Sequence, residues 1–194
     1  TVNDDLTTLG KYGLKKIHTV ANEALNNFDD EAYTHVLAEA VKNTGAEVIV
    51  FSNNFNGKAI APRLSVRLKA GLVSGAVALP DTTNGFVIKK NVFSGKAFAN
   101  VAITSAIKII SLNPNSYPVV KKEGTAIVET LDINIPSPKI KIKAVNKIEG
   151  EVLLTEAEIV VSGGRGLKGP ENWKMIEDLA HELHAATACS RPVA

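Results

Sequence analysis

The segment from Glu158 to Trp173 limits the possible folds of this chain more than any other part of it. It reads E-I-V-V-S-G-G-R-G-L-K-G-P-E-N-W, so an apolar strand runs into a glycine-rich turn that contains one arginine, and the turn opens into a helix. Parallel α/β folds present backbone N–H groups and a helix N-terminus to a phosphate in this way. The segment therefore predicts a nucleotide-binding strand–turn–helix within an α/β domain.

A second strand follows this helix and ends in T-A-C-S-R at Arg191. Strand, turn, helix and strand form one βαβ unit, and such folds bind ligands at the carboxyl edge of adjacent parallel strands. Arg165 and Ser190 are therefore expected to lie at the same edge. The glycines can adopt positive φ and let the backbone approach a ligand closely. The candidate cofactor-binding residues are Gly163, Gly164, Arg165, Gly166, Ser190 and Arg191.

Each of these residues also has a simpler interpretation. The glycines could serve only as a strand-to-helix connector, and Arg165 could pair with the carboxylate of Glu171. Ser190 and Arg191 could form an ordinary strand end with a solvated arginine. On the helix that follows the turn, one apolar face is predicted to pack on the sheet, which favours a packing role for its tryptophan. That face consists of Trp173, Ile176, Leu179, Ala180 and Leu183.

The residues before this segment alternate between strand and helix patterns and then become rich in strands. Helices are expected at 31–43 and at 58–70, with Gly71 as the left-handed residue that ends the second one. Strands are expected at 15–20, 47–52, 72–79, 86–90, 98–103, 107–111, 125–131 and 139–145. This pattern predicts an α/β fold that is three-layer and Rossmann-like, with a mostly parallel sheet.

We expect two domains. The first is an α/β domain over residues 1–152, and the second is the first βαβ unit of a second nucleotide-binding domain, over residues 153–194. The boundary is placed near Glu151 to Glu156, ahead of the strand that leads into the glycine-rich turn.

Composition excludes several classes of protein. A chain with 45% hydrophobic and 22% charged residues can bury a core, and a net charge of +2 predicts no nucleic-acid partner. No apolar run reaches the 18 or so residues that span a bilayer, so no direct membrane insertion is expected. The single cysteine excludes an intramolecular disulfide. His181 and His184 lack a third ligand, and no catalytic spacing stands out, so neither a metal site nor a catalytic residue is predicted.

The residues V-S-G-G-R-G-L-K at 161–168, followed by E-N, an aromatic residue, L-A and finally C-S-R, resemble the electron transfer flavoprotein alpha subunit at the start of its FAD domain. Upstream, Gly57 to Leu64 and Ser94 to Ala97 resemble two further segments of that family. The resemblance covers nearly the whole chain. Family members have a further strand and helix before the equivalent of Leu9 and continue past the equivalent of Ala194. The family segments G-Q-T-G and S-G-x-x-Q-H are absent here.

The resemblance implies that Arg165 and Ser190 contact FAD and that Arg191 lies against the isoalloxazine ring. A cation there favours the more negative, reduced flavin and raises its potential. Because most FAD contacts of the family are missing, this chain is expected to hold FAD weakly or not at all. The resemblance also implies a heterodimer with a beta subunit, in the bacterial cytoplasm or the mitochondrial matrix of a eukaryote.

Such a protein is an electron carrier without a substrate of its own. It accepts electrons from flavin dehydrogenases, such as the acyl-CoA dehydrogenases of fatty acid oxidation, and passes them to a quinone reductase of the respiratory chain. Two alternatives stay open. One is an NAD- or FAD-dependent oxidoreductase with its own substrate, although G-x-G-x-x-G with a ribose-binding acid is missing. The other is a non-redox nucleotide-binding interaction module.

Overall fold

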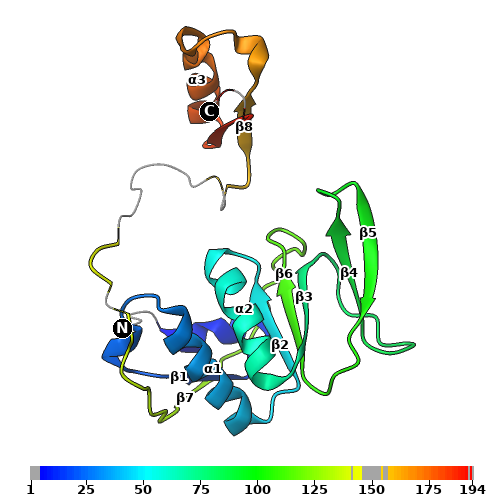
Figure 1. The fold of residues 1–194 in the computed structure, drawn as a ribbon, viewed down its shortest axis with the longest axis vertical. Helices are drawn as coiled ribbons and strands as arrows, with labels where there is room; N and C mark the ends of the chain where they lie inside the picture. Colours follow the sequence, from blue (N-terminus) through cyan, green and yellow to red (C-terminus); the bar gives the residue numbers. More distant parts are fainter. Residues whose placement is uncertain (1–4, 141, 146–153, 155–156, 192, 194) are drawn as a thin grey trace. The chain divides into compact units, whose positions relative to one another are not determined.

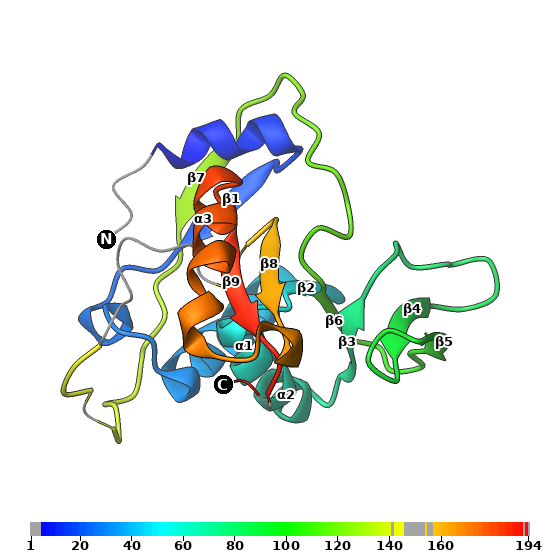
Figure 2. The ribbon, with the colours of Figure 1, turned by 90° about the horizontal axis from the view of Figure 1, so that it is seen from above.

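The computed structural model describes residues 5–140, 142–145, 154, 157–191 and 193. The chain forms two compact units, residues 1–142 and residues 143–194, which are described separately (Figures 1 and 2). The boundary predicted near Glu151 to Glu156 lies outside the described residues except for Leu154, and so does nearly all of the segment from Glu149 to Leu154.

A five-stranded sheet forms the centre of the first unit, in the order β2-β6-β3-β4-β5. Three of its strands run parallel, and the last two add an antiparallel hairpin. A separate parallel pair joins β1 and β7. The bounds are β1 Lys16–Thr19, β2 Val48–Ser52, β3 Gly71–Ala76, β4 Val87–Val92, β5 Ala97–Ala102, β6 Lys108–Leu112 and β7 Ile127–Thr130. The predicted α/β class with a mostly parallel central sheet is confirmed.

Two α-helices, α1 (Asp30–Thr44) and α2 (Phe55–Leu68), pack against each other, and α2 contacts β2, β3 and β6. Short 3₁₀ helices, η1 (Leu6–Tyr12) and η2 (Glu23–Leu25), precede them. The sequence fixes the ends of α1. The side chain of Asp29 accepts hydrogen bonds from two first-turn amides at 2.9 Å, and Gly45 ends the helix with a left-handed φ of 67°.

The end of α2 differs from the prediction, in which Gly71 is the left-handed residue. Lys69 takes that conformation instead, with φ 52°, and its amide bonds back to the carbonyls of Ser65 and Val66. Gly71 is the first residue of β3. A Cβ there would lie 2.5 Å from the Ile103 side chain, so glycine is required by strand packing and not by the helix cap.

Strand β6 carries the core of this unit on both of its faces. Ile109 packs with Ala61 and Leu64 of α2, whereas Ile110 packs with Val73 and Ile88 on the opposite side. A strand with apolar residues on both faces is typical of the middle of a parallel sheet. The edge strand β2 is also rich in apolar residues, but Val48 and Val50 are exposed.

One predicted strand is wrong. Of residues 139–145, those that the structure describes form no strand, and Ile140 and Val145 are more than half exposed. Pro136 and Pro138 precede the segment, and a proline cannot donate to a ladder, which makes it a poor entry into a sheet.

The second unit is one βαβ unit. Parallel strands β8 (Val160–Gly163) and β9 (Ala186–Cys189) are joined through η3 (Arg165–Leu167), η4 (Pro170–Asn172) and α3 (Lys174–Glu182). Helix α3 packs on both strands through Ile176 and Ala180, which are buried. Leu179 and Leu183 on the same predicted apolar face are 50% and 44% exposed. In the described parts of both units, no helix has the length and hydrophobicity of a transmembrane span.

Leu64 should contribute strongly to the stability of the first unit, because its side chain is fully buried. Leu64→Ala is expected to lower the free energy of unfolding by about 2–5 kcal/mol through lost burial and the cavity left behind. Urea unfolding followed by far-UV circular dichroism measures this. Val66→Ala is the matched control on the same helix, because Val66 is 81% exposed and should change stability by under about 0.5 kcal/mol. Equal effects of the two substitutions would contradict the packing described for α2.

The β1–β7 pair should become less stable in acid. Lys16 Nζ lies 2.8 Å from Glu129 Oε1, and this hydrogen bond lowers the pKa of Glu129 from its ordinary value of 4.5. A carboxylate with a lowered folded pKa stabilises the fold above its unfolded pKa, and the contribution is lost as pH falls through the folded value. The stability difference between the wild type and Glu129→Gln should therefore shrink between pH 7 and pH 3. A difference that stays constant with pH would exclude this role for the ion pair.

Candidate functional site

The carboxyl ends of β8 and β9 bring the two halves of the predicted site together. Gly163 pairs in register with Cys189, and the amide of Ser190 donates to the carbonyl oxygen of Gly163 at 3.2 Å. Arg165 and Ser190 therefore follow neighbouring parallel strands at one edge of the sheet, as predicted. This is the edge at which open α/β sheets bind ligands.

Gly163 is required by close packing. A Cβ at this position would lie 2.5 Å from Cζ3 of Trp173 and closer still to Cδ1 of Leu167. The ring of Trp173 thus rests almost directly on the backbone of β8, which confirms the packing role predicted for this residue. Only glycine leaves room for this contact.

The turn after β8 does not use the positive φ that its glycines permit. Gly164 is extended, with φ −126° and ψ −172°, and neither Gly163 nor Gly166 has a positive φ. The residue of the turn with a positive φ is Lys168 instead, with φ 66° and ψ −40°. One of the glycines, Gly163, instead leaves the space that the ring of Trp173 occupies.

The amides of the turn are suited to an anion. Leu167 and Lys168 donate their N–H groups to the carbonyls of Gly164 and Arg165, which closes the single turn of η3. Among the hydrogen bonds of the described residues, none has the amide of Gly164, Arg165 or Gly166 as its donor. Such a run of amides beside a cationic side chain is a common way to hold a phosphate.

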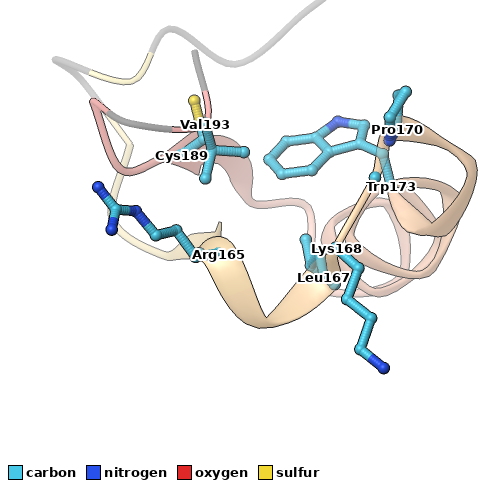
Figure 3. A pocket seen from close by; sticks show the side chains of 9 residues that line it. Arg165, Leu167, Lys168, Pro170, Trp173, Cys189 and Val193 are labelled. Carbon is cyan, nitrogen blue, oxygen red and sulfur yellow. The ribbon is translucent and has the colours of Figure 1, made fainter.

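A cavity of about 550 Å³ opens beside this turn, which is within the usual size of small-molecule sites. Its lining consists of Gly164, Arg165, Leu167, Lys168, Gly169, Pro170, Trp173, Cys189 and Val193. In Figure 3 the indole of Trp173 points toward Cys189 and Val193, and the side chain of Lys168 points away from the ring. The cavity thus has an aromatic and aliphatic wall with cationic side chains at its rim.

The alternative prediction, an ion pair between Arg165 and Glu171, is wrong. No ion pair of Arg165 occurs among the described residues, and the carboxylate of Glu171 lies against Gly169 instead. Lys174, at the start of α3, differs from Arg165 in this respect. It lies 2.9 Å from Asp178, and that hydrogen bond raises the pKa of Lys174. Among the described residues, the guanidinium of Arg165 has no carboxylate partner.

Four predicted residues do not line this cavity. Gly163 is buried under the ring of Trp173, and Gly166 lines a second hollow beside the turn. Ser190 and Arg191 follow β9 as exposed residues. The sequence predicts packing for Trp173 and gives no signal for Lys168 or Cys189 as cavity-lining residues. The structure supplies that signal for Cys189 through its register opposite Gly163, because paired residues at parallel strand ends share one edge.

In the described part of the first unit, the polar residues near the carboxyl ends of the strands bond to one another or cap a helix. Asn56, Gly57 and Lys58 lie in the first turn of α2, where Asn54 caps the helix by accepting from the amide of Gly57 at 2.9 Å. Nearby, Asn53 bonds to Asn113 and to Ser111, both at 2.7 Å, so these side chains hold the strand ends together. Across the described residues of both units, no group of three potential metal ligands occurs.

Comparison with known proteins connects this geometry to a family. Residues 2–136 match the electron transfer flavoprotein domain, and residues 153–194 match the electron transfer flavoprotein FAD-binding domain. The electron transfer flavoprotein subunit alpha of Bacillus subtilis is 30% identical over 183 residues, which cover 93% of this chain and 56% of that protein.

Other relatives agree with this match. The corresponding alpha subunit of Syntrophomonas wolfei is 29% identical over 184 residues, covering 93% of this chain and 58% of that protein. A mitochondrial homologue in Caenorhabditis elegans is 29% identical over 186 residues, covering 92% of this chain and 54% of that protein. The chain therefore spans a little over half the length of these relatives.

Gly163→Ala should disturb the second unit specifically. The added methyl group would meet the ring of Trp173, and overpacking of this kind costs about 1–3 kcal/mol. Trp173 is the only tryptophan, so its fluorescence reports on this unit alone, and its emission should shift to longer wavelength as the ring moves into water. Gly164→Ala is the matched control, because a Cβ there meets nothing within 4 Å. If both variants behave alike, the contact of the ring with Gly163 does not determine this packing.

Proposed function

The chain belongs to the electron transfer flavoprotein family, as an alpha subunit, and on this basis we propose that it carries electrons by means of a bound FAD. The observation that supports this most directly is the shared edge of β8 and β9. One cavity at this edge is bordered by the turn of residues 164–166, by the guanidinium of Arg165 and by the ring of Trp173. All of these residues lie in the segment that matches the FAD-binding domain. In this role the chain turns over no substrate of its own.

The residues present fit part of a flavin nucleotide. Phosphate oxygens need N–H donors and a positive charge, which the turn at residues 164–166 and the guanidinium of Arg165 offer. The space that Gly163 leaves against Trp173 keeps the turn close to the helix, so these donors are held in place by packing. Lys168 would add a second positive charge at the rim.

FAD supplies the redox chemistry, by taking up electrons from one partner and giving them to another. The protein binds the cofactor and sets its potential. The carbon-rich wall of Trp173, Leu167 and Val193 would limit the access of water on one side. Arg191, whose charge persists at every working pH, would stabilise negative charge on the reduced ring and so raise the potential.

The partners follow from the same proposal. The chain would pair with an electron transfer flavoprotein beta subunit and receive electrons from flavin dehydrogenases, including those that act on acyl-CoA. A quinone reductase of the respiratory chain would accept them. In a eukaryote this places the protein in the mitochondrial matrix, and in a bacterium in the cytoplasm.

FAD should quench the fluorescence of Trp173 if it enters this cavity, because the ring forms part of the wall. Titration of FAD into the 194-residue chain is expected to give weak saturable quenching, and Arg165→Ala should weaken it by about tenfold, as the loss of a charge-assisted hydrogen bond predicts. Lys174→Ala is the matched control, because Lys174 is paired with Asp178. Equal quenching by FAD in Arg165→Ala and in the wild type would remove Arg165 from the site.

Arg191→Ala, tested in the complex with the beta subunit loaded with FAD, should act on redox energetics more than on folding. The midpoint potential is expected to fall by about 59 mV, which is a tenfold change in a one-electron equilibrium constant. Arg191→Lys keeps the charge but not the planar guanidinium, so it should recover part of the shift. Stability should change by under about 0.5 kcal/mol, because the residue is exposed at a strand end. An unchanged potential would place Arg191 outside the flavin environment.

A further inference from the structure

A histidine of α1 joins three segments of the first unit. Nη2 of Arg67, on α2, lies 2.8 Å from Nδ1 of His35, and Nε2 of the same ring lies 2.9 Å from the carbonyl oxygen of Asn134. Residues 131–140, here called the strap, follow β7 and form no helix or strand. His35 therefore bonds to α2 through one ring nitrogen and to the strap through the other.

The strap is held in the first unit by more than this bond. Ile133 is buried, and Nζ of Lys139 lies 2.8 Å from Oε1 of Glu31 on α1. At its start, the amide of Leu131 donates to the carbonyl oxygen of Thr19 at 2.8 Å. His35 thus connects an anchored segment to both helices.

The chemistry of the two partners determines where the ring carries its proton. A guanidinium has only donors and stays charged at every working pH, so Nδ1 of His35 must accept from Arg67 and carries no proton. A carbonyl oxygen only accepts, so Nε2 must donate to Asn134 and carries the one proton. Both bonds therefore form together only when the ring is neutral.

A second proton on the ring would break one of these bonds and leave the other. It would occupy Nδ1 and place two cations at the 2.8 Å contact between His35 and Arg67. Nε2 would still donate to Asn134. Histidine side chains ordinarily change charge between pH 5 and pH 8, so a modest change of pH decides which bonds the ring can make.

We propose that His35 is a pH-sensitive joint of the first unit. Its neutral ring ties α2 to α1 and to the strap, and its protonated ring releases α2. The strap is the last fully described segment before the second unit begins at residue 143, so the joint sets whether this segment is tied to one helix or to two. The joint lies within the first unit, and its action requires no FAD.

The other charged groups around the joint leave this repulsion in place. Most of those on α1, α2 and the strap form ion pairs at 2.7 or 2.8 Å, namely Asp30–Arg63, Glu31–Lys139 and Glu39–Lys42. The hydrogen bond from Lys42 lowers the pKa of Glu39, and the charges of His35 and Arg67 add to this effect. The Glu39 carboxylate attracts both cations of the joint, but it is shared with Lys42. Asp132 of the strap is exposed.

A double-mutant cycle at two pH values tests the joint. His35→Ala, Arg67→Ala and the double variant give the coupling between the two side chains, measured by urea unfolding followed by far-UV circular dichroism. At pH 7.5 the coupling should favour the folded chain by about fivefold in the unfolding equilibrium constant, as expected of a surface hydrogen bond to a charged group. At pH 5 it should vanish or reverse, because the protonated ring repels the guanidinium.

The ion pair between Asp30 and Arg63 is the matched control. It joins the same two helices one turn away, at 2.8 Å, and contains no histidine. An aspartate ordinarily stays charged at pH 5, so the coupling in a cycle of Asp30→Ala and Arg63→Ala should be the same at both pH values. A coupling of His35 to Arg67 that is absent at pH 7.5, or that persists at pH 5, would overturn the proposal. Equal losses in the two cycles would also overturn it, because they would indicate a general loosening of α1 from α2.

Long-range ¹H–¹⁵N correlation spectra of the full chain give a readout that does not depend on stability. The chain has four histidines, and the signals lost in His35→Ala identify those of His35. At pH 7.5 the ring should carry its proton on Nε2 with Nδ1 bare, and at pH 5 both nitrogens should be protonated. A proton on Nδ1 at pH 7.5 would contradict the bond from Arg67, and a ring that is still singly protonated at pH 5 would show that the joint does not respond to pH.

Discussion

The contact between the ring of Trp173 and the backbone of Gly163 fixes the geometry of the second unit. It brings the helical segment so close to β8 that no side chain fits between them, and it sets where the turn of residues 164–168 must run. Because β8 and β9 pair in parallel register, the turn then lies beside Ser190 and Cys189. Every feature of the proposed FAD site depends on this one close approach, including the cavity and the position of Arg165.

The first unit relies on a different constraint, which is the central position of β6. Its two neighbours are parallel, and Ile109 and Ile110 place apolar side chains in clusters on opposite faces of the sheet. The polar ends of the strands are held by Asn53, Ser111 and Asn113, whose side-chain groups satisfy one another. Because these groups already have partners, the carboxyl edge of the first sheet offers less to a ligand than the edge formed by β8 and β9.

Much of this could be predicted from the sequence wherever the signal is local. The cap residue Asp29 begins α1 and the left-handed Gly45 ends it, so both signals are local. The β-branched run of β2 identifies a strand, but not its place at the sheet edge, where Val48 and Val50 are exposed. The predictions that failed depend on contacts between residues that are far apart in the sequence. Gly71 resembled a helix-ending glycine, but its neighbour is Ile103, and the role of Gly163 depends on Trp173. Whether Arg165 would meet Glu171 depended on side-chain geometry that spacing along the chain does not determine. The edge shared by Arg165 and Ser190 was predictable because parallel strands define it.

Two of the places where this chain departs from local rules differ in what compensates for the departure. At the turn after β8, Lys168 adopts a positive φ within a segment that is held by hydrogen bonds and by the ring of Trp173. At the tip of the β4–β5 hairpin, Phe93 adopts one at an exposed position, with Lys89 and Lys96 nearby. At the turn after β8, packing and hydrogen bonds within the same unit hold Lys168 in its conformation. At the hairpin tip, the described residues of the first unit supply no such support for Phe93.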